Sequence, residues 1–203
     1  MKATRLSLFP LGGALLFPRM HLPLHIFEPR YRALVTDALA RDRRIGMIQP
    51  RDASDPPALF EMGCVGRIAE VEALPDGRFD IVLEGLARFT LVRELDVTTP
   101  FRQAEAELEP AGDGEVLALA ERASLEMEAR RFADGLGYAV DWEAVTRLDD
   151  ESLVNGIAQI APFDVASKQA LLEADSLRDR SELIVQLMQF FSRHGDEGAV
   201  TLQ

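Results

Sequence analysis

The residues whose types and spacing come nearest to a metal site lie close to the N-terminus. His21 and His25 are four residues apart, and Glu28 follows three residues later. Pro23 excludes a regular helix there, but in a strand residues four apart lie on the same face of a sheet. The alternative is that His25 hydrogen-bonds a backbone carbonyl and that Glu28 stands near a helix start, where the helix dipole favours a carboxylate. We favour this alternative and expect no metal ion.

Two further residues have side chains suited to covalent catalysis. Cys64 is the single cysteine, and a thiolate beside a histidine is a nucleophile, but a small buried residue in a strand is the interpretation we favour. Lys168 follows Ser167, which suggests a serine–lysine pair. However, neighbouring residues of a helix point about 100° apart, and a solvated lysine keeps its high pKa. We expect neither residue to be catalytic.

The motifs that mark common enzyme sites are missing from the sequence. The phosphate-binding loop, the hydrolase nucleophile turn and the dinucleotide-binding loop would read GxxxxGK(S/T), GxSxG and GxGxxG. None of these patterns occurs in the 203 residues. The sequence therefore predicts a protein that is not an enzyme and that uses no cofactor.

The overall charge argues against partners that are themselves anionic. The chain carries 34 acidic and 22 basic residues, a net charge of −12. Because nucleic-acid binding depends largely on the neutralisation of phosphates, we do not expect binding to nucleic acid or to an anionic membrane. A single cysteine forms no intrachain disulfide, and the N-terminal residues do not resemble a signal peptide. We expect a cytoplasmic protein.

The composition changes near residue 110 and predicts an α+β protein of two parts. Residues 1–110 are rich in glycine, proline and β-branched residues, whereas residues 111–203 are rich in helix formers. A β-rich part followed by a helical part is typical of α+β folds rather than of alternating βαβ units. Pro75-Asp76-Gly77 predicts a hairpin turn. The expected strands cover Arg5–Phe9, His21–Phe27, Ile45–Gln49, Cys64–Leu74, Arg78–Leu86, Arg88–Leu95 and Arg102–Leu108, with a helix over Glu28–Arg43.

Capping residues predict where the helices of the second part begin. Asp149, Asp164 and the pair Ser176 and Asp179 are typical N-terminal caps, and they predict helices that run to Ile160, Glu173 and about His194. We expect Gly195 to end the last of these helices. An earlier helix is expected over about Glu115–Ala133, and its apolar residues at helical spacing predict the buried face. That stripe consists of Val116, Leu119, Ala120, Ala123 and Met127.

Three proline-containing segments near the N-terminus resemble the opening of the Lon N-terminal (substrate-binding) domain. They are Leu8-Phe9-Pro10-Leu11, Leu16-Phe17-Pro18 and the ten residues Leu22–Tyr31, which read LPLHIFEPRY. Gly63–Ile68 and Glu84–Phe89 resemble two later strands of the same family, so the motifs extend over about residues 5–109. Arg19 departs from the pattern, because a glycine commonly follows the second segment in the family, and the backbone there is expected to differ.

The resemblance implies a PUA-like bent β-barrel with one embedded helix, followed by a C-terminal helical bundle. In full-length Lon this region precedes an ATPase domain and a Ser–Lys peptidase domain, and we expect a free-standing member that lacks both. The implied function is non-catalytic recognition of unfolded or client polypeptides. Two alternatives stay open, namely an RNA-binding PUA-like protein and an adaptor or regulator of a Lon-type protease, which would then be a partner.

Recognition of exposed polypeptide segments needs accessible apolar surface, which suggests five candidate residues. They are Leu24, Phe27, Tyr31, Arg88 and Phe89. The alternative for the three aromatic residues is core packing, because a small barrel buries its aromatics first. Arg30 and Arg88 are expected either to pair with Glu28 or Glu84 or to hold a partner's carboxylate.

Overall fold

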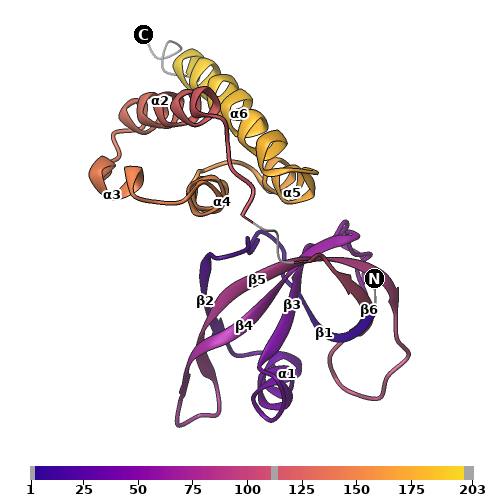
Figure 1. The fold of residues 1–203 in the computed structure, drawn as a ribbon. Helices are drawn as coiled ribbons and strands as arrows, with labels where there is room; N and C mark the ends of the chain where they lie inside the picture. Colours follow the sequence, from indigo (N-terminus) through magenta and orange to yellow (C-terminus); the bar gives the residue numbers. More distant parts are fainter. Residues whose placement is uncertain (1–2, 111–113, 199–203) are drawn as a thin grey trace. The chain divides into compact units, whose positions relative to one another are not determined.

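The chain consists of two compact units, Met1–Gly112 and Asp113–Gln203 (Figure 1). The computed structural model describes residues 3–110 and 114–198, and within 194–198 it describes the backbone alone. In this described part of the chain, no helix has the length and apolar character needed to cross a membrane.

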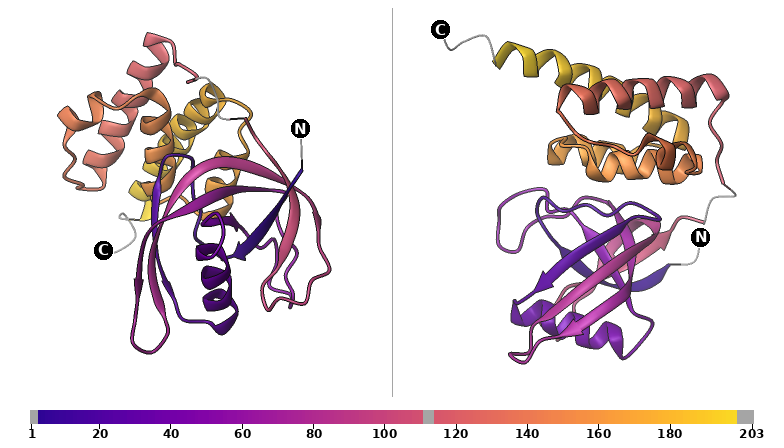
Figure 2. Two further views of the ribbon diagram at one scale, coloured as in Figure 1. Left: turned by 60° about the horizontal axis from the view of Figure 1, so that its bottom comes forward. Right: turned by 90° about the vertical axis from the view of Figure 1, so that its left-hand side faces the viewer.

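The first unit is built on one mixed sheet with the strand order β2-β5-β4-β3-β1-β6. β6, the last strand in this order, also pairs with β5, the second strand. The strands curve strongly (Figure 2). β1 and β3 are parallel, and the other pairs are antiparallel. The strands are β1 Thr4–Pro10, β2 His21–Ile26, β3 Arg44–Ile48, β4 Met62–Ala73, β5 Phe79–Glu94 and β6 Gln103–Leu108.

α1 covers Pro29–Leu39, is the one helix among the described residues of this unit, and lies between β2 and β3 in the chain. Pro29 occupies its first turn, where the missing N–H is not needed. The hydroxyl of Tyr31 donates to the carbonyl of Pro10 at 2.8 Å, and its ring packs on Phe9 at 4.1 Å between centroids. α1 is thereby anchored to β1.

The predicted strands and the α+β class are confirmed, with two differences in extent. α1 ends four residues before Arg43, because Arg43 turns into the left-handed region (φ 62°) and its N–H donates back to Ala38. The two strands expected over Arg78–Leu86 and Arg88–Leu95 form one long strand, β5.

Gly85 is both a bulge and a point of close approach, the two possibilities that a glycine inside a strand suggests. The register shifts here, because Gly66 pairs with Gly85 while Val65 pairs with Ala87. The Gly85 N–H donates to Met20 and its carbonyl accepts from Arg19, both at 2.8 Å. A side chain at this position would overlap the carbonyl of Phe17. The bulge therefore receives the loop between β1 and β2.

Arg19 lies within this docked loop and has a φ of 66°. This is the left-handed conformation that favours glycine, the residue that commonly stands here in the family that the sequence resembles. The backbone at Arg19 thus adopts a glycine-like turn although the residue is an arginine.

The core of the first unit is a cluster of apolar residues from the bent sheet. Phe89 of β5 is fully buried at its centre. Ala104 and Ala106 of β6 are also fully buried. The other buried members are Leu6, Leu8, Ile48 and Val65.

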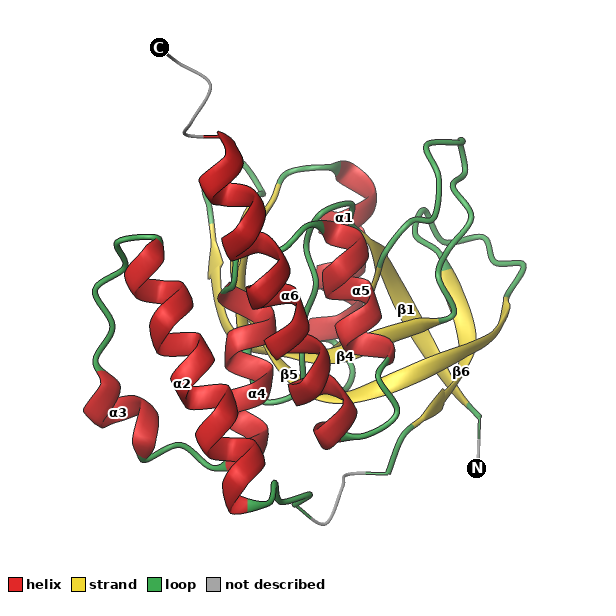
Figure 3. Ribbon diagram, turned by 90° about the horizontal axis from the view of Figure 1, so that it is seen from above, coloured by secondary structure: helices red, strands yellow, loops and turns green. Residues whose placement is uncertain are grey.

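The second unit contains five helices among its described residues, and α6 packs against α2, α4 and α5 (Figure 3). The cap predictions are confirmed, because Asp149 accepts from the Ser152 N–H at 3.0 Å and Asp164 accepts from the Ser167 N–H at 2.7 Å. The helices are α2 Leu119–Gly135, α3 Trp142–Thr146, α4 Asp150–Ile160, α5 Val165–Glu173 and α6 Leu177–Gly198.

The prediction for the last helix of this unit needs correction in extent, and one short helix was not predicted. The expected capping pair is present, since Ser176 Oγ accepts from the Asp179 N–H at 3.0 Å, but α6 continues through Gly195 to Gly198. A glycine inside a helix costs only about 1 kcal/mol, so it does not by itself end one. The short α3 was not predicted, because five residues are too few to show a helical period.

The predicted buried face of α2 is wrong. Leu119 and Met127 are 90% and 67% exposed, and the rest of the predicted stripe is also exposed. The buried residues are Leu125, Ala129, Phe132 and Ala133 with the polar Glu128, on the opposite side of the helix. α2 carries apolar residues on two faces, and the face with the larger leucine and phenylalanine side chains is the one that packs.

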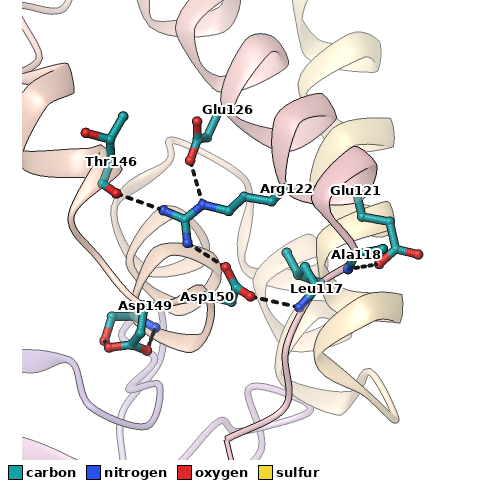
Figure 4. A network of polar contacts seen from close by, with 9 residues as sticks. Leu117, Ala118, Glu121, Arg122, Glu126, Thr146, Asp149 and Asp150 are labelled. Atoms are coloured by element: carbon teal, nitrogen blue, oxygen red, sulfur yellow. Dashed lines mark hydrogen bonds and ion pairs between the residues drawn. The ribbon is translucent and has the colours of Figure 1, made fainter.

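α2 also begins at Leu119 rather than at Glu115, because a buried carboxylate holds the preceding residues (Figure 4). Asp150, at the start of α4, accepts from the Leu117 N–H at 2.8 Å and from the Arg122 guanidinium at 2.5 Å. The hydrogen bond that Arg122 donates to Asp150 is the main cause that raises the pKa of Arg122. Arg122 also donates to Glu126 at 2.8 Å, so one arginine joins the beginnings of α2 and α4.

Candidate functional site

β2 is the free edge of the sheet. Each of the other strands that the structure describes has at least two neighbours, whereas β2 pairs with β5 alone. The outer side of β2 therefore presents backbone groups to which another extended chain can add. Pro23 lies in the middle of this edge and has no N–H to donate, so the exposed ladder is interrupted.

A groove of about 410 Å³ crosses the sheet beside this edge. Leu24 of β2 is half-buried in it and lies opposite Ile81 of β5, which lies opposite Val71 of β4. An apolar row thus runs across three strands. The groove is lined by Pro23, Leu24, His25, Glu70, Val71, Glu72, Asp80, Ile81 and Val82.

Phe27 lies directly after β2 and is 60% exposed. Its ring stacks on that of His25 with 6.2 Å between centroids. A large aromatic side chain held at the surface beside a groove and a free strand edge is typical of an interaction surface. Phe27 is thus exposed and Leu24 half-buried, and a role of the two residues in binding stays a prediction.

Within the described part of the chain, the His25 ring hydrogen-bonds side chains and no backbone carbonyl, so that interpretation is wrong. Its Nδ1 lies 2.5 Å from Asp80 Oδ1, and its Nε2 lies 3.1 Å from Arg78 Nη1. Asp80 lies directly opposite His25 in the β2–β5 register. No local sequence signal identifies this pair, because β2 and β5 are not consecutive strands and 55 residues separate His25 from Asp80.

The three residues considered as metal ligands are not brought together. His21 lies opposite Glu84, whose pKa is lowered chiefly by its hydrogen bond from Arg67. Glu28 accepts from Arg30 at 2.9 Å. Among the residues that the structure describes, no group of three histidine, cysteine or carboxylate side chains is arranged to hold a metal ion.

Tyr31 and Phe89, the other two aromatic candidates, lie in the core. Phe89 is fully buried, and Tyr31 is buried against β1, which raises the pKa of its hydroxyl. Neither ring presents surface to a partner in this conformation, which agrees with the alternative of core packing.

Arg88, the fifth candidate, is mostly buried and forms an ion pair. Its Nε donates to Glu109 at 2.5 Å. Glu84, the partner considered from the sequence, instead accepts from Arg67 at 2.5 Å. Arg30 and Arg88 thus both have carboxylates of the same chain, and the arrangement supports a structural ion pair for each.

The two residues considered for covalent catalysis lie in different surroundings. Cys64 is fully buried in β4. Lys168 is partly buried and not fully solvated, contrary to our expectation, and this burial lowers its pKa. Its ammonium group donates to the Gln159 carbonyl at 2.7 Å. The Ser167 N–H meanwhile donates to the cap Asp164.

Sequence relatives of this chain are Lon proteases. Lon protease 2 of Myxococcus xanthus is 30% identical over 192 residues, which are 90% of this chain and 23% of that protein. Lon protease 2 of Sorangium cellulosum (strain So ce56) is 30% identical over 201 residues, 92% of this chain and 24% of that protein. The chain therefore spans about a quarter of the length of these curated relatives.

Solved structures and a family model also relate this chain to the N-terminal region of Lon proteases. The Lon N-terminal domain protein from Xanthomonas campestris shares the fold with a TM-score of 0.70 at 22% identity, covering 90% of this chain and 98% of that one. The N-terminal domain of the Mycobacterium avium complex Lon protease gives 0.67 at 17% identity, with 92% and 98% coverage. The model of the ATP-dependent protease La (LON) substrate-binding domain matches residues 5–189. The chain belongs to the family of LON substrate-binding domains.

Proposed function

We propose that this protein is a non-catalytic recognition unit for unfolded or client polypeptides. The observation that carries the proposal is the coincidence, in a substrate-binding-domain fold, of the free β2 edge, the groove beside it and the exposed ring of Phe27. Each of these features suits an extended, partly apolar segment of another chain. The proposal places the protein in the cytoplasm, where it acts on clients directly or as an adaptor of a Lon-type protease.

The proposed mode of binding is addition of a client segment along β2. Backbone hydrogen bonds to the strand edge supply affinity that is independent of client sequence, and apolar client side chains contact Leu24 and Phe27. Pro23 removes one donor from the edge, so the added strand is short. We therefore expect dissociation constants of about micromolar or weaker, reached without ATP.

Binding of a permanently unfolded, carboxymethylated model protein tests the proposal. Phe27→Ser is expected to weaken binding about tenfold, because an accessible aromatic anchor carries much of such an interface. Phe190→Ser is the matched control, since Phe190 of α6 is 54% exposed but lies in the other unit. Fluorescence anisotropy titrations of the three proteins give the comparison.

Two results would overturn the proposed function, and a third would overturn only the proposed site. Binding of RNA without binding of the unfolded protein would favour an RNA-binding function on a PUA-like fold. Peptide or ATP hydrolysis that disappears in Cys64→Ala or His25→Ala would identify an enzyme. Equal loss of binding in Phe27→Ser and Phe190→Ser would remove the β2 edge as the site.

A further inference from the structure

A second hollow, of about 490 Å³, lies between the first turns of α1 and the turn that joins β4 to β5. Along the chain, its lining residues come close to those of the groove in two places. Phe79 lines the hollow and the next residue, Asp80, lines the groove; in the sequence, Phe27 stands between His25 of the groove and Pro29 of the hollow. The hollow is lined by Pro29, Arg32, Ala33, Thr36, Gly77 and Phe79.

Arg32 is the one charged residue in this lining, and its side chain is half-buried. The guanidinium lies directly on the turn, because a Cβ at Gly77 would overlap its Nη2 atom. Gly77 has a φ of 80°, so the turn that supports the guanidinium depends on a glycine. Across residues 3–110 and 114–193, where side chains are described, no carboxylate forms an ion pair with Arg32.

The acidic residues nearest to Arg32 in the chain and in the turn are each paired with a different arginine. Glu28, one helical turn before Arg32, contacts Arg30 at 2.9 Å. Asp37 contacts Arg41 at 3.1 Å. Asp76 contacts Arg78 at 2.6 Å, and the hydrogen bond from the Arg78 backbone is the main cause that lowers the pKa of Asp76. The positive charge of Arg32 therefore stays uncompensated beside the apolar surface of Phe79 and Pro29.

We propose that the hollow at Arg32 binds a carboxylate of the client polypeptide that occupies the adjacent β2 groove, an inference that rests on the proposed function. A guanidinium offers two parallel N–H donors that match the two oxygens of a carboxylate. Partial burial displaces competing water and strengthens the attraction. The carboxylate is either the C-terminal carboxylate of the client chain or an acidic side chain. The site therefore favours client polypeptides in which a carboxylate lies close to an apolar segment.

Three labelled peptides with one apolar sequence test the inference. One ends in a free carboxylate, one ends in an amide, and one ends in an amide but contains one glutamate. The wild-type protein is expected to bind the peptides with a carboxylate about three- to tenfold more tightly than the neutral peptide. Because the protein carries a net charge of −12, a preference for anionic peptides requires a local cation. The better of the two anionic peptides identifies the source of the carboxylate.

Arg32→Gln is expected to abolish this preference while binding of the neutral peptide is unchanged. Arg41→Gln is the matched control, since it removes the same charge from the exposed, paired Arg41 beyond the other end of α1 and is expected to keep the preference. Arg32→Lys retains the charge without the paired donors and is expected to keep part of it. Circular dichroism and thermal unfolding establish that each variant is folded.

The outcomes separate the two proposals. If the wild-type protein binds all three peptides equally, or if Arg32→Gln keeps the preference, the carboxylate site is wrong and polypeptide recognition stands. If no peptide binds the wild-type protein, polypeptide recognition is wrong and the carboxylate site falls with it.

Discussion

Phe27 is 60% exposed at the end of β2, whereas Phe89 is fully buried in β5. Both were candidates for binding from the sequence, because an aromatic residue serves a core and an interface equally well. Their neighbours decide between the two roles. Phe89 packs into the cluster formed by β1, β3, β4 and β6, and Phe27 lies after the last residue of an edge strand.

Alanine substitutions of these two rings are expected to affect stability very differently. Phe89→Ala should lower the free energy of unfolding by about 3–5 kcal/mol, because it leaves a cavity in the core. Phe27→Ala should change it by less than about 0.5 kcal/mol, because the ring is largely solvated. Urea unfolding followed by circular dichroism measures both. Similar losses for the two variants would contradict the assignment of Phe89 to the core and Phe27 to the surface.

Asp164 gives the helical unit a contribution to stability that depends on pH. Its side chain caps α5, and hydrogen bonds from Ser167 lower its pKa below the ordinary value. A lowered pKa in the folded state means that the contribution is present above the ordinary aspartate pKa of about 4 and is lost as the pH falls through the folded-state value. Asp164→Asn keeps a capping oxygen that does not titrate.

We therefore expect Asp164→Asn to match the wild-type stability at neutral pH to within about 0.5 kcal/mol, and to lose less of it on acidification. Urea unfolding at neutral pH and near pH 3 measures the difference. An identical acid-induced loss in both proteins would show that Asp164 does not contribute through its carboxylate.

At the scale of elements, α2 shows how packing selects one of two apolar faces. Leu125 and Phe132 face the interior of the unit, and the ring of Phe132 lies 5.9 Å from that of Phe163. The opposite stripe is exposed, although its spacing is equally helical. Periodicity therefore identified a helix but could not decide its orientation, since a period of 3.6 residues is the same for either face.

Leu125→Ala and Met127→Ala test this orientation at neighbouring positions. Leu125→Ala should lower the free energy of unfolding by about 2–4 kcal/mol, because the side chain is fully buried. Met127→Ala should change it by less than about 0.5 kcal/mol, since Met127 is largely exposed. Denaturant unfolding of the two variants gives the values. A larger effect at Met127 would mean that the stripe predicted from the sequence is the packed face.

At the scale of the whole molecule, the chain separates into a unit built on a sheet and a unit built of helices. Each has its own buried core, around Phe89 in the first and around Leu125, Leu171 and Ile184 in the second. The expected division into residues 1–110 and 111–203 stays a prediction about independent folding. A unit with its own core can fold without the other.

Separate chains of residues 1–112 and 113–203 are expected to fold. The sum of their circular dichroism spectra should reproduce the spectrum of the whole protein, and each should unfold cooperatively. The β unit alone should retain binding of the unfolded model protein, because Leu24 and Phe27 both belong to it. A β unit that is unfolded in isolation would show that the two units depend on each other for stability.

Local chemistry in the sequence was enough to predict the class, most elements and the family. Asp149 and Asp164 cap helices through hydrogen bonds to the residues three positions later, so the relevant partners are adjacent in the chain. Pro75-Asp76-Gly77 forms the turn between β4 and β5 for the same reason. The proline-containing segments up to Tyr31 carried the resemblance that the family comparison confirms.

Only the tertiary structure decided which side chains meet. His25 contacts Asp80, 55 residues away, and Arg88 of β5 contacts Glu109, which directly follows β6. Among the side chains that the structure describes, Arg32 has no carboxylate partner, because three neighbouring acidic residues pair with other arginines. Such contacts follow from strand register and from competition among many similar charges, which depend on how distant segments pack. Capping and turn formation act over three or four residues, and the pairing that shapes the candidate site acts over the whole unit.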